Sequence, residues 1–481
     1  MKRGLSPFFI KGPMKMNRFI LLGAVSDVAC RYVYPALTEL EDSRQLPDGF
    51  VVRGITKNEW TDIEQLRRHI GKRVAERRPD IDQKSLHNNV LGRLEHASGD
   101  LRELPQLRKA LGPLGRPVTL YLGLPPDIAE TVVANLCELG LPAGSRIILE
   151  KPFGRDRQSA ERLNLALHRI LPEESIFRLD HFLGKQTAQN ILGVRFANRV
   201  LEQLWNRDHV DRVEIIWEET RAPEGRIGYY DSAGALKDMI QNHLLQLMCL
   251  LAMEPPPAIT EQELRDRKMA LLASVLQFNA DEIASHTVRG RYTAGRIEDG
   301  EVPNYVDQPG VDPARRTETF AQVRLFVDNQ RWKGVPFVLR TGKALASDRQ
   351  ELSVFFKPPT HTPFLPSNHT KLNRLCMRLK PDRVGLRVNI NGPGNPLEAE
   401  PTELETKLAP DRLSPYATLI SDVLIGDPMF FIRNDEAEEA WKIIDPIVTA
   451  WANDRVPLRQ YQAGSHGPVA IAWDGAAKHV G

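Results

Sequence analysis

The feature that most constrains the fold is a regular alternation of short apolar runs with amphipathic or charged stretches between Arg18 and about Arg178. Four of these runs have the length of strands: Phe19–Leu22, Phe50–Val52, Val118–Leu122 and Arg146–Leu149. Continuous apolar strands separated by helices are typical of a parallel sheet covered on both faces. This region is therefore predicted to form a doubly wound α/β domain, with a ligand crevice at the carboxyl ends of its strands.

The pattern changes after about residue 207. Longer strand-like segments follow, many without an intervening helix: Asp211–Trp217, His286–Tyr292, Thr319–Asp328, Val335–Arg340, Glu351–Lys357 and Arg374–Asn389. They predict a large, mainly antiparallel sheet, accompanied by helices at Ala233–Leu251, Leu413–Leu424 and Asp435–Ala452. We expect a flexible tail at residues 1–16, a doubly wound domain at 17–178 and a β+α domain at 179–481, with the site in the cleft between the domains.

The composition excludes several classes of protein. Lysine and arginine number 64 and aspartate and glutamate 62, which gives a formal charge of +2 rather than the basic excess of a nucleic-acid-binding surface. No run approaches the roughly 20 apolar residues of a membrane helix, and Phe8–Ile10 is too short for the centre of a signal peptide. The four cysteines lack the spacing of a zinc or disulfide framework. We expect a cytoplasmic protein that uses no metal and binds neither nucleic acid nor membranes.

The turn after the first predicted strand suits the pyrophosphate of a dinucleotide. Gly23 begins this turn, where the N–H groups of a following helix would face a phosphate. Ser26 stands where a second glycine would allow a closer approach, and an ordinary strand-to-helix turn is the alternative. After the second strand comes Lys57 rather than an acidic residue, which favours NADP over NAD; a solvated surface lysine is the alternative there.

A second cluster, Phe177–Lys185, interleaves charged and apolar residues. If a helix begins near Asp180, His181 and Lys185 lie four residues apart and share one face. Two cations on the first turn of a helix would form an anion site suited to a phosphate monoester. Each residue also has a purely structural interpretation, and Asp180 could simply cap the helix.

A third cluster, Tyr229–His243, carries polar side chains into an apolar helix. Buried polar groups need partners, but Asp238 and His243 are five residues apart, about 140° around a helix, so Asp238 cannot orient that imidazole. Asp180 is then the candidate partner, because a histidine held by a carboxylate in one tautomer can take a proton from a hydroxyl. A hydrogen-bonded core histidine is the alternative for His243.

Segments spread over about residues 18–470 together resemble the glucose-6-phosphate dehydrogenase family. They occur in the family's order and spacing: Glu150-Lys151-Pro152-Phe153-Gly154, Asp180-His181-x-Leu183-Gly184-Lys185, Tyr229-Tyr230-Asp231, Asp238–His243, Arg340-Thr341-Gly342-Lys343, Gly426-Asp427 and Gly464–Pro468. The resemblance implies a Rossmann domain followed by a β+α domain for substrate binding and dimerisation. It also implies oxidation of glucose 6-phosphate at C1 with NADP, giving 6-phosphogluconolactone in the first oxidative step of the pentose phosphate pathway, by a homodimer or homotetramer.

The resemblance also implies roles for single residues. His243 would be the general base that takes the C1 hydroxyl proton as hydride leaves for the nicotinamide, and Asp180 would hold His243. The substrate-binding residues would be Lys151, His181, Lys185, Glu219, Asp238, Lys343 and Arg349, with the phosphate on His181 and Lys185. The cofactor-binding residues would be Gly23, Ser26, Asp27, Arg31, Lys57 and Lys151, and the Lys151–Pro152 peptide would be cis.

The chain departs from the family pattern mainly in its binding residues. Ser26 and Tyr32 stand where the nucleotide loop of the family has its second glycine and a lysine. Phe182 replaces a tyrosine whose hydroxyl helps to hold the phosphate, and Lys57 replaces an arginine and its bidentate fork.

A further departure lies after Lys343. The cation expected five residues later falls at Asp348, and the adjacent Arg349 is expected to substitute for it. Since the residues of the chemistry match better than the binding residues, we expect a working enzyme that binds weakly. A dehydrogenase of another sugar phosphate or one that prefers NAD, and a paralogue that only binds or regulates, are the alternatives.

Overall fold

The structure is a computed structural model that describes residues 16–60, 62–223, 227–298, 300–364, 371–391 and 397–468. The chain divides into two compact units. Unit 1 consists of Met1–Lys185, Ala258–Arg265 and Asp411–Glu438, and unit 2 of Gln186–Pro257, Asp266–Pro410 and Glu439–Gly481. Unit 1 thus takes in a late segment that the sequence analysis placed in the second domain. The expected flexible tail lies outside the described residues except for Met16, which is buried.

Unit 1 is built on a parallel sheet. In the described part of the chain this sheet has six strands in the order β3-β2-β1-β4-β5-β6, and all neighbouring pairs are parallel. The strands are β1 (Arg18–Leu22), β2 (Val51–Thr56), β3 (Leu94–Ser98), β4 (Thr119–Leu122), β5 (Arg146–Glu150) and β6 (Ile176–Leu179). This is the strand order of the doubly wound dinucleotide-binding fold, so the predicted α/β architecture is confirmed.

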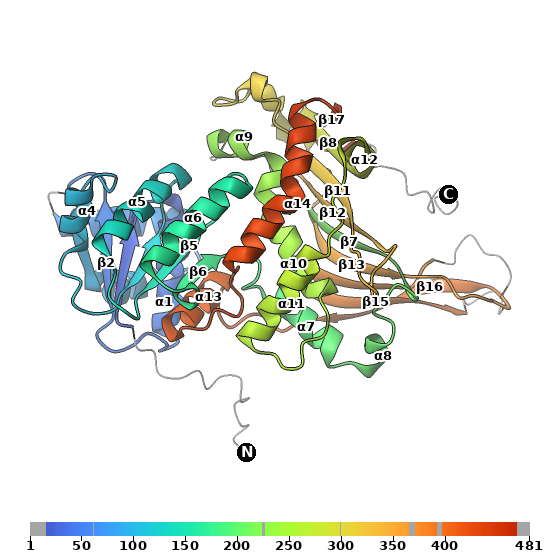
Figure 1. The fold of residues 1–481 in the computed structure, drawn as a ribbon, viewed down its shortest axis with the longest axis horizontal. Helices are drawn as coiled ribbons and strands as arrows, with labels where there is room; N and C mark the ends of the chain where they lie inside the picture. The colour runs from blue at the N-terminus through green and yellow to red at the C-terminus, as the bar shows by residue number, and fades with distance from the viewer. Residues whose placement is uncertain are drawn as a thin grey trace, which may run out of the picture. The chain divides into compact units, whose positions relative to one another are not determined.

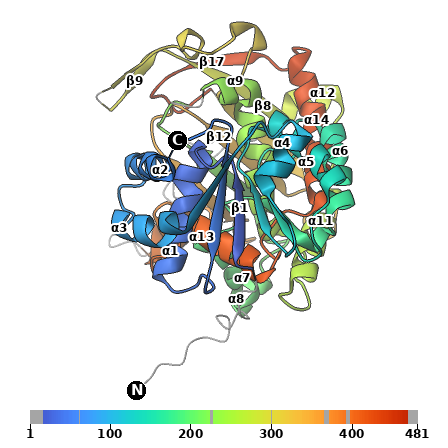
Figure 2. The ribbon, with the colours of Figure 1, turned by 90° about the vertical axis from the view of Figure 1, so that its left-hand side faces the viewer.

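Helices cover both faces of this sheet, with α1 and α2 on one face and α5 and α6 on the other (Figure 2). The helices and helical turns are η2 (Ala29–Val33), α1 (Tyr34–Asp42), α2 (Ile63–Arg77), α3 (Gln83–Ser85), η3 (Leu86–Val90), η4 (Leu91–Arg93), α4 (Leu104–Leu111), α5 (Pro126–Leu139), α6 (Arg157–Ile170), η5 (Glu173–Ser175) and α13 (Pro415–Ile425). The strands between them are buried on both sides, which is why they are almost continuously apolar.

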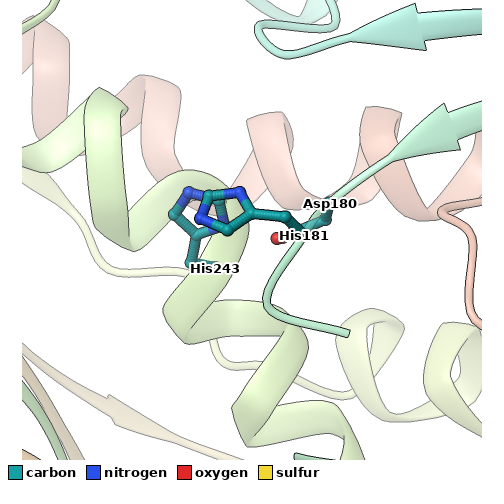
Figure 3. A group of neighbouring side chains, drawn as sticks. All are labelled: Asp180, His181 and His243. Carbon is teal, nitrogen blue, oxygen red and sulfur yellow. The ribbon is translucent and has the colours of Figure 1, made fainter. Parts of the chain in front are cut away.

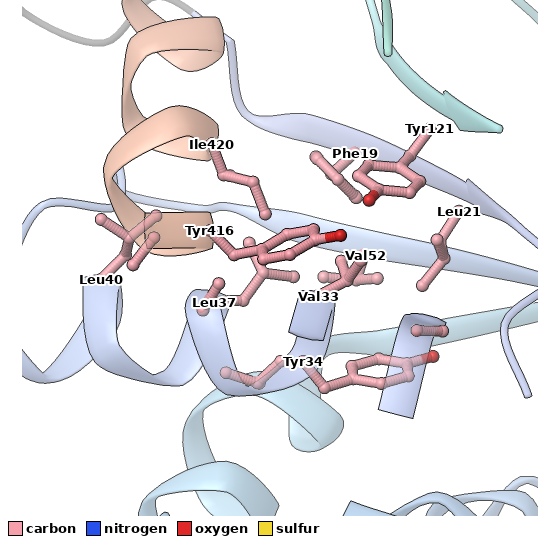
Figure 4. Close-up of a cluster of buried hydrophobic side chains, with 14 of the residues drawn as sticks. Phe19, Leu21, Val33, Tyr34, Leu37, Leu40, Val52, Tyr121, Tyr416 and Ile420 are labelled. Atoms are coloured by element: carbon pink, nitrogen blue, oxygen red, sulfur yellow. The ribbon is translucent and has the colours of Figure 1, made fainter. Parts of the chain in front are cut away.

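Helix α13 completes the core of unit 1 although it comes from near the end of the chain. Tyr416 and Ile420 on α13 pack in one buried cluster with Phe19 of β1 and Leu37 of α1 (Figure 4). The Ser414 hydroxyl caps the helix by accepting a hydrogen bond from the Ala417 N–H at 3.3 Å. The apolar face of α13 is therefore part of the nucleotide-binding half of the protein.

Unit 2 is built on a mainly antiparallel sheet (Figure 1). Over the described residues this sheet has nine strands in the order β16-β15-β14-β13-β7-β12-β11-β8-β17, with only β7–β12 and β8–β17 parallel. Its strands are β7 (Val210–Glu218), β8 (Thr287–Thr293), β11 (Phe320–Phe326), β12 (Pro336–Gly342), β13 (Arg349–Phe356), β14 (Arg374–Leu379), β15 (Asp382–Asn391), β16 (Ala399–Lys407) and β17 (Leu458–Gln462), and a separate hairpin joins β9 (Gly295–Ile297) and β10 (Gly300–Val302). The large sheet that the sequence predicted is confirmed. The prediction of a single long strand at Arg374–Asn389 is wrong, because the chain turns at Lys380–Pro381 and forms the two strands β14 and β15.

Helical segments pack against this sheet, η6 on β11 and β12 and α7 on β14. The helical segments that lie wholly in unit 2 are α7 (Gln186–Phe196), α8 (Arg199–Glu202), α9 (Ile227–Ala235), η6 (Leu236–Leu244), α10 (Leu245–Ala252), α12 (Ala280–His286), η7 (Tyr305–Asp307) and η8 (Pro313–Arg315). Two longer helices, α11 (Glu261–Ala273) and α14 (Asn434–Ala452), contribute residues to both units. In the part of the chain that the structure describes, no helix combines the length and the apolar character needed to span a membrane.

Candidate active site

The turn after β1 has a backbone shape that only glycine fits. Gly23 has φ +82°, and a Cβ atom there would lie 2.4 Å from the carbonyl oxygen of Gly123. The N–H groups of Gly23 and Ala24 both donate to the carbonyl oxygen of Ile55, each at 3.0 Å. The turn is therefore tightly bound to its neighbouring strands β2 and β4.

Ser26 caps the helix that follows this turn. Its N–H donates to the Gly23 carbonyl at 2.9 Å, and its hydroxyl oxygen accepts a hydrogen bond from the Ala29 N–H at 3.1 Å. A serine in this position satisfies one of the free N–H groups at a helix start. The side chain that replaces a glycine of the family pattern thus has a structural role of its own.

The remaining predicted cofactor-binding residues lie at the same edge of the sheet. Asp27 forms an ion pair with Arg77 of α2 at 3.1 Å, and Arg31 is partly exposed, with its guanidinium 5.3 Å from the centre of the Tyr32 ring. Lys57 is exposed directly after β2. The carboxyl ends of parallel strands are where such folds bind nucleotides.

Lys151 follows β5 at this edge, and its peptide bond to Pro152 is cis, as expected. The preceding residue, Glu150, accepts hydrogen bonds from the hydroxyl of Tyr121 and, at 3.2 Å, from that of Tyr416. Burial and the Glu150 carboxylate hold the pKa of Tyr121 well above its usual value, so this phenol remains a donor. The backbone leading to Lys151 is therefore fixed by two tyrosines from different elements.

The segment after β6 is a hydrogen-bonded turn rather than the expected start of a helix (Figure 3). The buried Asp180 accepts the Phe182 N–H at 2.9 Å through Oδ1, and the Gly184 N–H donates to the His181 carbonyl at 3.3 Å. Helix α7 begins only at Gln186. The prediction that His181 and Lys185 share one face of a helix was therefore wrong, since an aspartate that binds the backbone two residues ahead favours a turn.

His243 and Asp238 lie on η6 in unit 2, and Figure 3 shows His243 on this helix. His243 is buried, with 1% of its surface exposed, whereas Asp238 is partly exposed. Burial and the nearby Asp238 carboxylate raise the pKa of Tyr230 well above its usual value. Asp180 belongs to unit 1 and His243 to unit 2, and their pairing stays a prediction.

The structure brings Glu219 and Lys343 together as an ion pair at the ends of the parallel strands β7 and β12. The Glu219 N–H donates to the Gly342 carbonyl at 3.0 Å, and the Lys343 N–H donates to the Thr319 carbonyl at 2.9 Å. The Lys343 ammonium also lies 6.0 Å from the centre of the Tyr230 ring. Two of the expected substrate-binding residues are thus held side by side by their backbones.

Arg349 is engaged elsewhere on the sheet. Its guanidinium donates two hydrogen bonds to Glu351, at 2.7 and 2.9 Å. Asp348, which occupies the position of the expected cation, accepts hydrogen bonds from the N–H and hydroxyl of Thr220 at 2.8 and 3.0 Å. The substrate-binding role expected for Arg349 stays a prediction, and it would require this guanidinium to leave or share its glutamate.

Two residues that contribute to the site's framework were missed in the sequence. Tyr416 binds Glu150 beside Lys151, and Glu318 accepts the Leu236 N–H at the start of η6, at 3.0 Å. The signal for Tyr416 was a polar tip on the apolar face of the helix predicted at Leu413–Leu424. Glu318 gave a clearer signal, because it is a lone acid between two threonines, directly before the strand predicted at Thr319–Asp328.

Comparison with known proteins identifies the family. The family model for the glucose-6-phosphate dehydrogenase NAD-binding domain matches residues 20–190, and the model for the C-terminal domain matches residues 192–477. A glucose-6-phosphate 1-dehydrogenase of Mycolicibacterium smegmatis is 37% identical over 482 residues, which cover 96% of each chain. One of Gluconobacter oxydans is 36% identical over 466 residues, which cover 94% of each chain.

Solved structures agree with this result. The crystal structure of glucose-6-phosphate 1-dehydrogenase from Mycobacterium avium is 31% identical, with a TM-score of 0.82 over 94% of this chain and 95% of that one. A glucose-6-phosphate dehydrogenase in complex with its substrate glucose-6-phosphate is 30% identical, with a TM-score of 0.84 over 97% of this chain and 98% of that one. With both domain models matched in order and relatives similar along nearly the whole length, this chain belongs to the glucose-6-phosphate dehydrogenase family.

Proposed function

We propose that this protein oxidises glucose 6-phosphate at C1 by hydride transfer to NADP, giving 6-phosphogluconolactone. The proposal is carried by one observation: in a chain that belongs to this family along its length, His243 and Asp180 are both retained in the segments that would perform the chemistry. The reaction converts the sugar and NADP⁺ into the lactone, NADPH and one proton.

In this mechanism His243 takes the proton of the C1 hydroxyl. The O–H electron pair becomes the second bond of the lactone carbonyl, and C1 releases its hydrogen as hydride. NADP supplies the hydride acceptor when it is bound. Asp180 would hold the imidazole in one tautomer and stabilise its protonated form. Both side chains are 1% exposed, and an environment poor in water strengthens such an interaction.

The phosphate of the substrate would bind the cations His181 and Lys185, and Lys151 would bridge coenzyme and substrate. The sugar hydroxyls would bind Glu219, Lys343 and Asp238. The Glu219–Lys343 pair offers an acceptor and a donor side by side, which suits neighbouring hydroxyls of a sugar. Fixing these hydroxyls orients C1, where a small positional error is costly for the rate.

NADP is proposed over NAD because Lys57, directly after β2, and Arg31, on η2, provide positive charge that suits a 2′-phosphate. The capped turn at Gly23 and Ser26 would hold the pyrophosphate on the helix start. Comparing kcat/KM for NADP and NAD tests this preference. An enzyme faster with NAD would favour the alternative that its nucleotide loop has lost 2′-phosphate recognition.

The activity is tested by following NADPH formation from glucose 6-phosphate, and then with His243→Asn. Loss of the general base should lower kcat about 10²- to 10⁴-fold. The exposed His209 provides the matched control, since His209→Asn removes an imidazole away from the proposed chemistry. A His243→Asn enzyme as fast as the wild type would refute the mechanism, and a wild-type protein that forms no NADPH would refute the function.

We propose a cytoplasmic homodimer or homotetramer. The thiols of Cys30, Cys137 and Cys376 form no disulfide, which suits a reducing compartment. Ile390 of β15 and Leu404 of β16 are large apolar side chains that expose 53% and 61% of their surfaces on paired strands, and a subunit interface would cover them. Light scattering coupled to size-exclusion chromatography measures the mass directly, and a monomer at working concentration would contradict the proposed assembly.

A further inference from the structure

Three aromatic rings form a stack within unit 1. The Tyr32 and Tyr416 rings are nearly parallel, with centroids 4.4 Å apart and planes 7° apart. The His181 ring lies 6.2 Å from Tyr32 at 25° and 5.7 Å from Tyr416 at 22°. These separations fall in the range of attractive offset stacking. The imidazole proposed to bind the phosphate is thus lined by two phenol rings.

The backbone elements that hold these rings are well anchored. Tyr32 belongs to η2, which continues the helix capped by Ser26. Tyr416 lies in the first turn of α13, and its hydroxyl binds Glu150 at 3.2 Å. Phe182 closes the group edge-on, 4.9 Å from the His181 ring at 72°. The stack therefore connects the nucleotide turn, α13 and the turn after β6.

The electrostatics of the stack suit an imidazole that receives an anion. Aromatic faces carry partial negative charge and attract cations within about 6 Å of the ring centre. Arg31 already lies 5.3 Å from the centre of Tyr32. A protonated imidazole against the same ring faces would be favoured in the same way and could donate to a phosphate oxygen.

We propose that Tyr32 is a positioning residue for His181: its ring, stacked on Tyr416, holds the imidazole in place for the phosphate of the substrate. This inference rests on the proposed function. It gives a role to the position where the chain departs from the lysine of the family pattern, because Tyr32 acts through the ring of His181 rather than by a charge of its own. Substrate affinity in this enzyme would then depend on a side chain of the nucleotide-binding helix.

The test compares Tyr32→Leu, which removes the ring, with Tyr32→Phe, which keeps it. Tyr32→Leu should raise KM for glucose 6-phosphate about three- to tenfold, the factor that corresponds to the usual worth of an aromatic pair, while kcat changes less than twofold. The Ki of inorganic phosphate, used as a competitive inhibitor, should rise by the same factor. Tyr32→Phe should keep the wild-type KM and Ki.

A matched control exists in unit 2, where the Phe278 ring stacks on His286 at 4.3 Å and 24°. Phe278→Leu removes a comparable ring from a histidine outside the proposed site and should leave KM unchanged. Thermal melting checks that each variant is folded, and Tyr32→Met replaces Tyr32→Leu if the latter fails to fold.

The outcomes separate this inference from the proposed function. If the wild type reduces NADP with glucose 6-phosphate and Tyr32→Leu has the same KM and phosphate Ki, the positioning role is wrong while the function stands. If Tyr32→Phe is as impaired as Tyr32→Leu, the hydroxyl rather than the ring is responsible, and the inference is also overturned. A wild type without activity refutes the proposed function itself.

Discussion

Replacing Glu318 with glutamine should change how the stability of this protein depends on pH. Glu318 is 9% exposed, and its carboxylate accepts the Leu236 N–H at 3.0 Å where η6 begins. Burial raises the pKa of Glu318 from its ordinary 4.5 to about 7, although the hydrogen bond from Leu236 and the charges of Lys237 and Arg289 favour the ionised form. This acid is therefore largely neutral in the folded protein at mildly acidic pH.

The sign and size of the effect follow from proton linkage. Below pH 4.5 the carboxyl is protonated in both the folded and the unfolded chain. Between pH 4.5 and about 7 the unfolded chain releases the proton and the folded chain keeps it, so stability present at low pH is lost as the pH rises. The difference between the two pKa values corresponds to about 3 kcal/mol, of which about 2.5 kcal/mol falls between about pH 5 and pH 8.

Urea unfolding of the wild type and Glu318→Gln across this pH range measures the effect. Glutamine does not ionise, and its amide oxygen can still accept the Leu236 N–H. The free energy of unfolding of the variant, relative to the wild type, should therefore rise by about 2.5 kcal/mol from about pH 5 to pH 8. The matched control Glu301→Gln replaces an exposed glutamate and should give a difference that does not vary with pH. A pH-independent difference for Glu318→Gln would refute the reasoning.

Two ion pairs, Glu219–Lys343 and Glu173–Arg178, give further predictions. Glu219→Gln and Lys343→Gln should each raise KM for glucose 6-phosphate at least several-fold. Because the side chains are paired, the double variant should raise KM by much less than the product of the two single effects. An increase equal to that product would show that the two side chains act separately. Glu173→Gln should lower the free energy of unfolding by about 3 kcal/mol, because it leaves the fully buried Arg178 without its ion pair at 2.8 Å. Glu174→Gln, at an exposed neighbouring position, should have little effect, and equal losses in the two variants would contradict this account.

The sequence predicted the fold best where burial and periodicity agree. The strands β1, β4 and β5 were predicted within one or two residues because they are almost continuously apolar. Strand β3 was not predicted. Its sequence is LEHAS, and it lies at the edge of the sheet, where its polar side chains reach water. Strand β6 was not predicted either. It contains the fully buried Arg178, which is paired with Glu173 and Asn164, and the sequence alone does not reveal these tertiary contacts.

The sequence predicted which residues belong to the site better than it predicted how they are arranged. The ion pair of Glu219 with Lys343 brings two of the expected substrate-binding residues together, and the cis peptide at Lys151 agrees with the expectation. The turn at Asp180 does not, since its side chain captures a backbone N–H and delays the start of α7. The stack around Tyr32 could not be predicted, because Tyr416 lies far along the chain and reaches this ring only through the packing of α13 on α1.

The place of α13 has a consequence for synthesis on the ribosome. A nascent chain that ends near residue 190, where the match to the N-terminal family model stops, already contains every strand of the parallel sheet. It lacks Tyr416, Ile420 and the other apolar side chains with which α13 covers Phe19 and Leu37. Until α13 (Pro415–Ile425) has been synthesised, Phe19 and Leu37 lack this apolar cover and stay open to water and to chaperones. The core of unit 1 is therefore completed only after a late part of the chain has been synthesised.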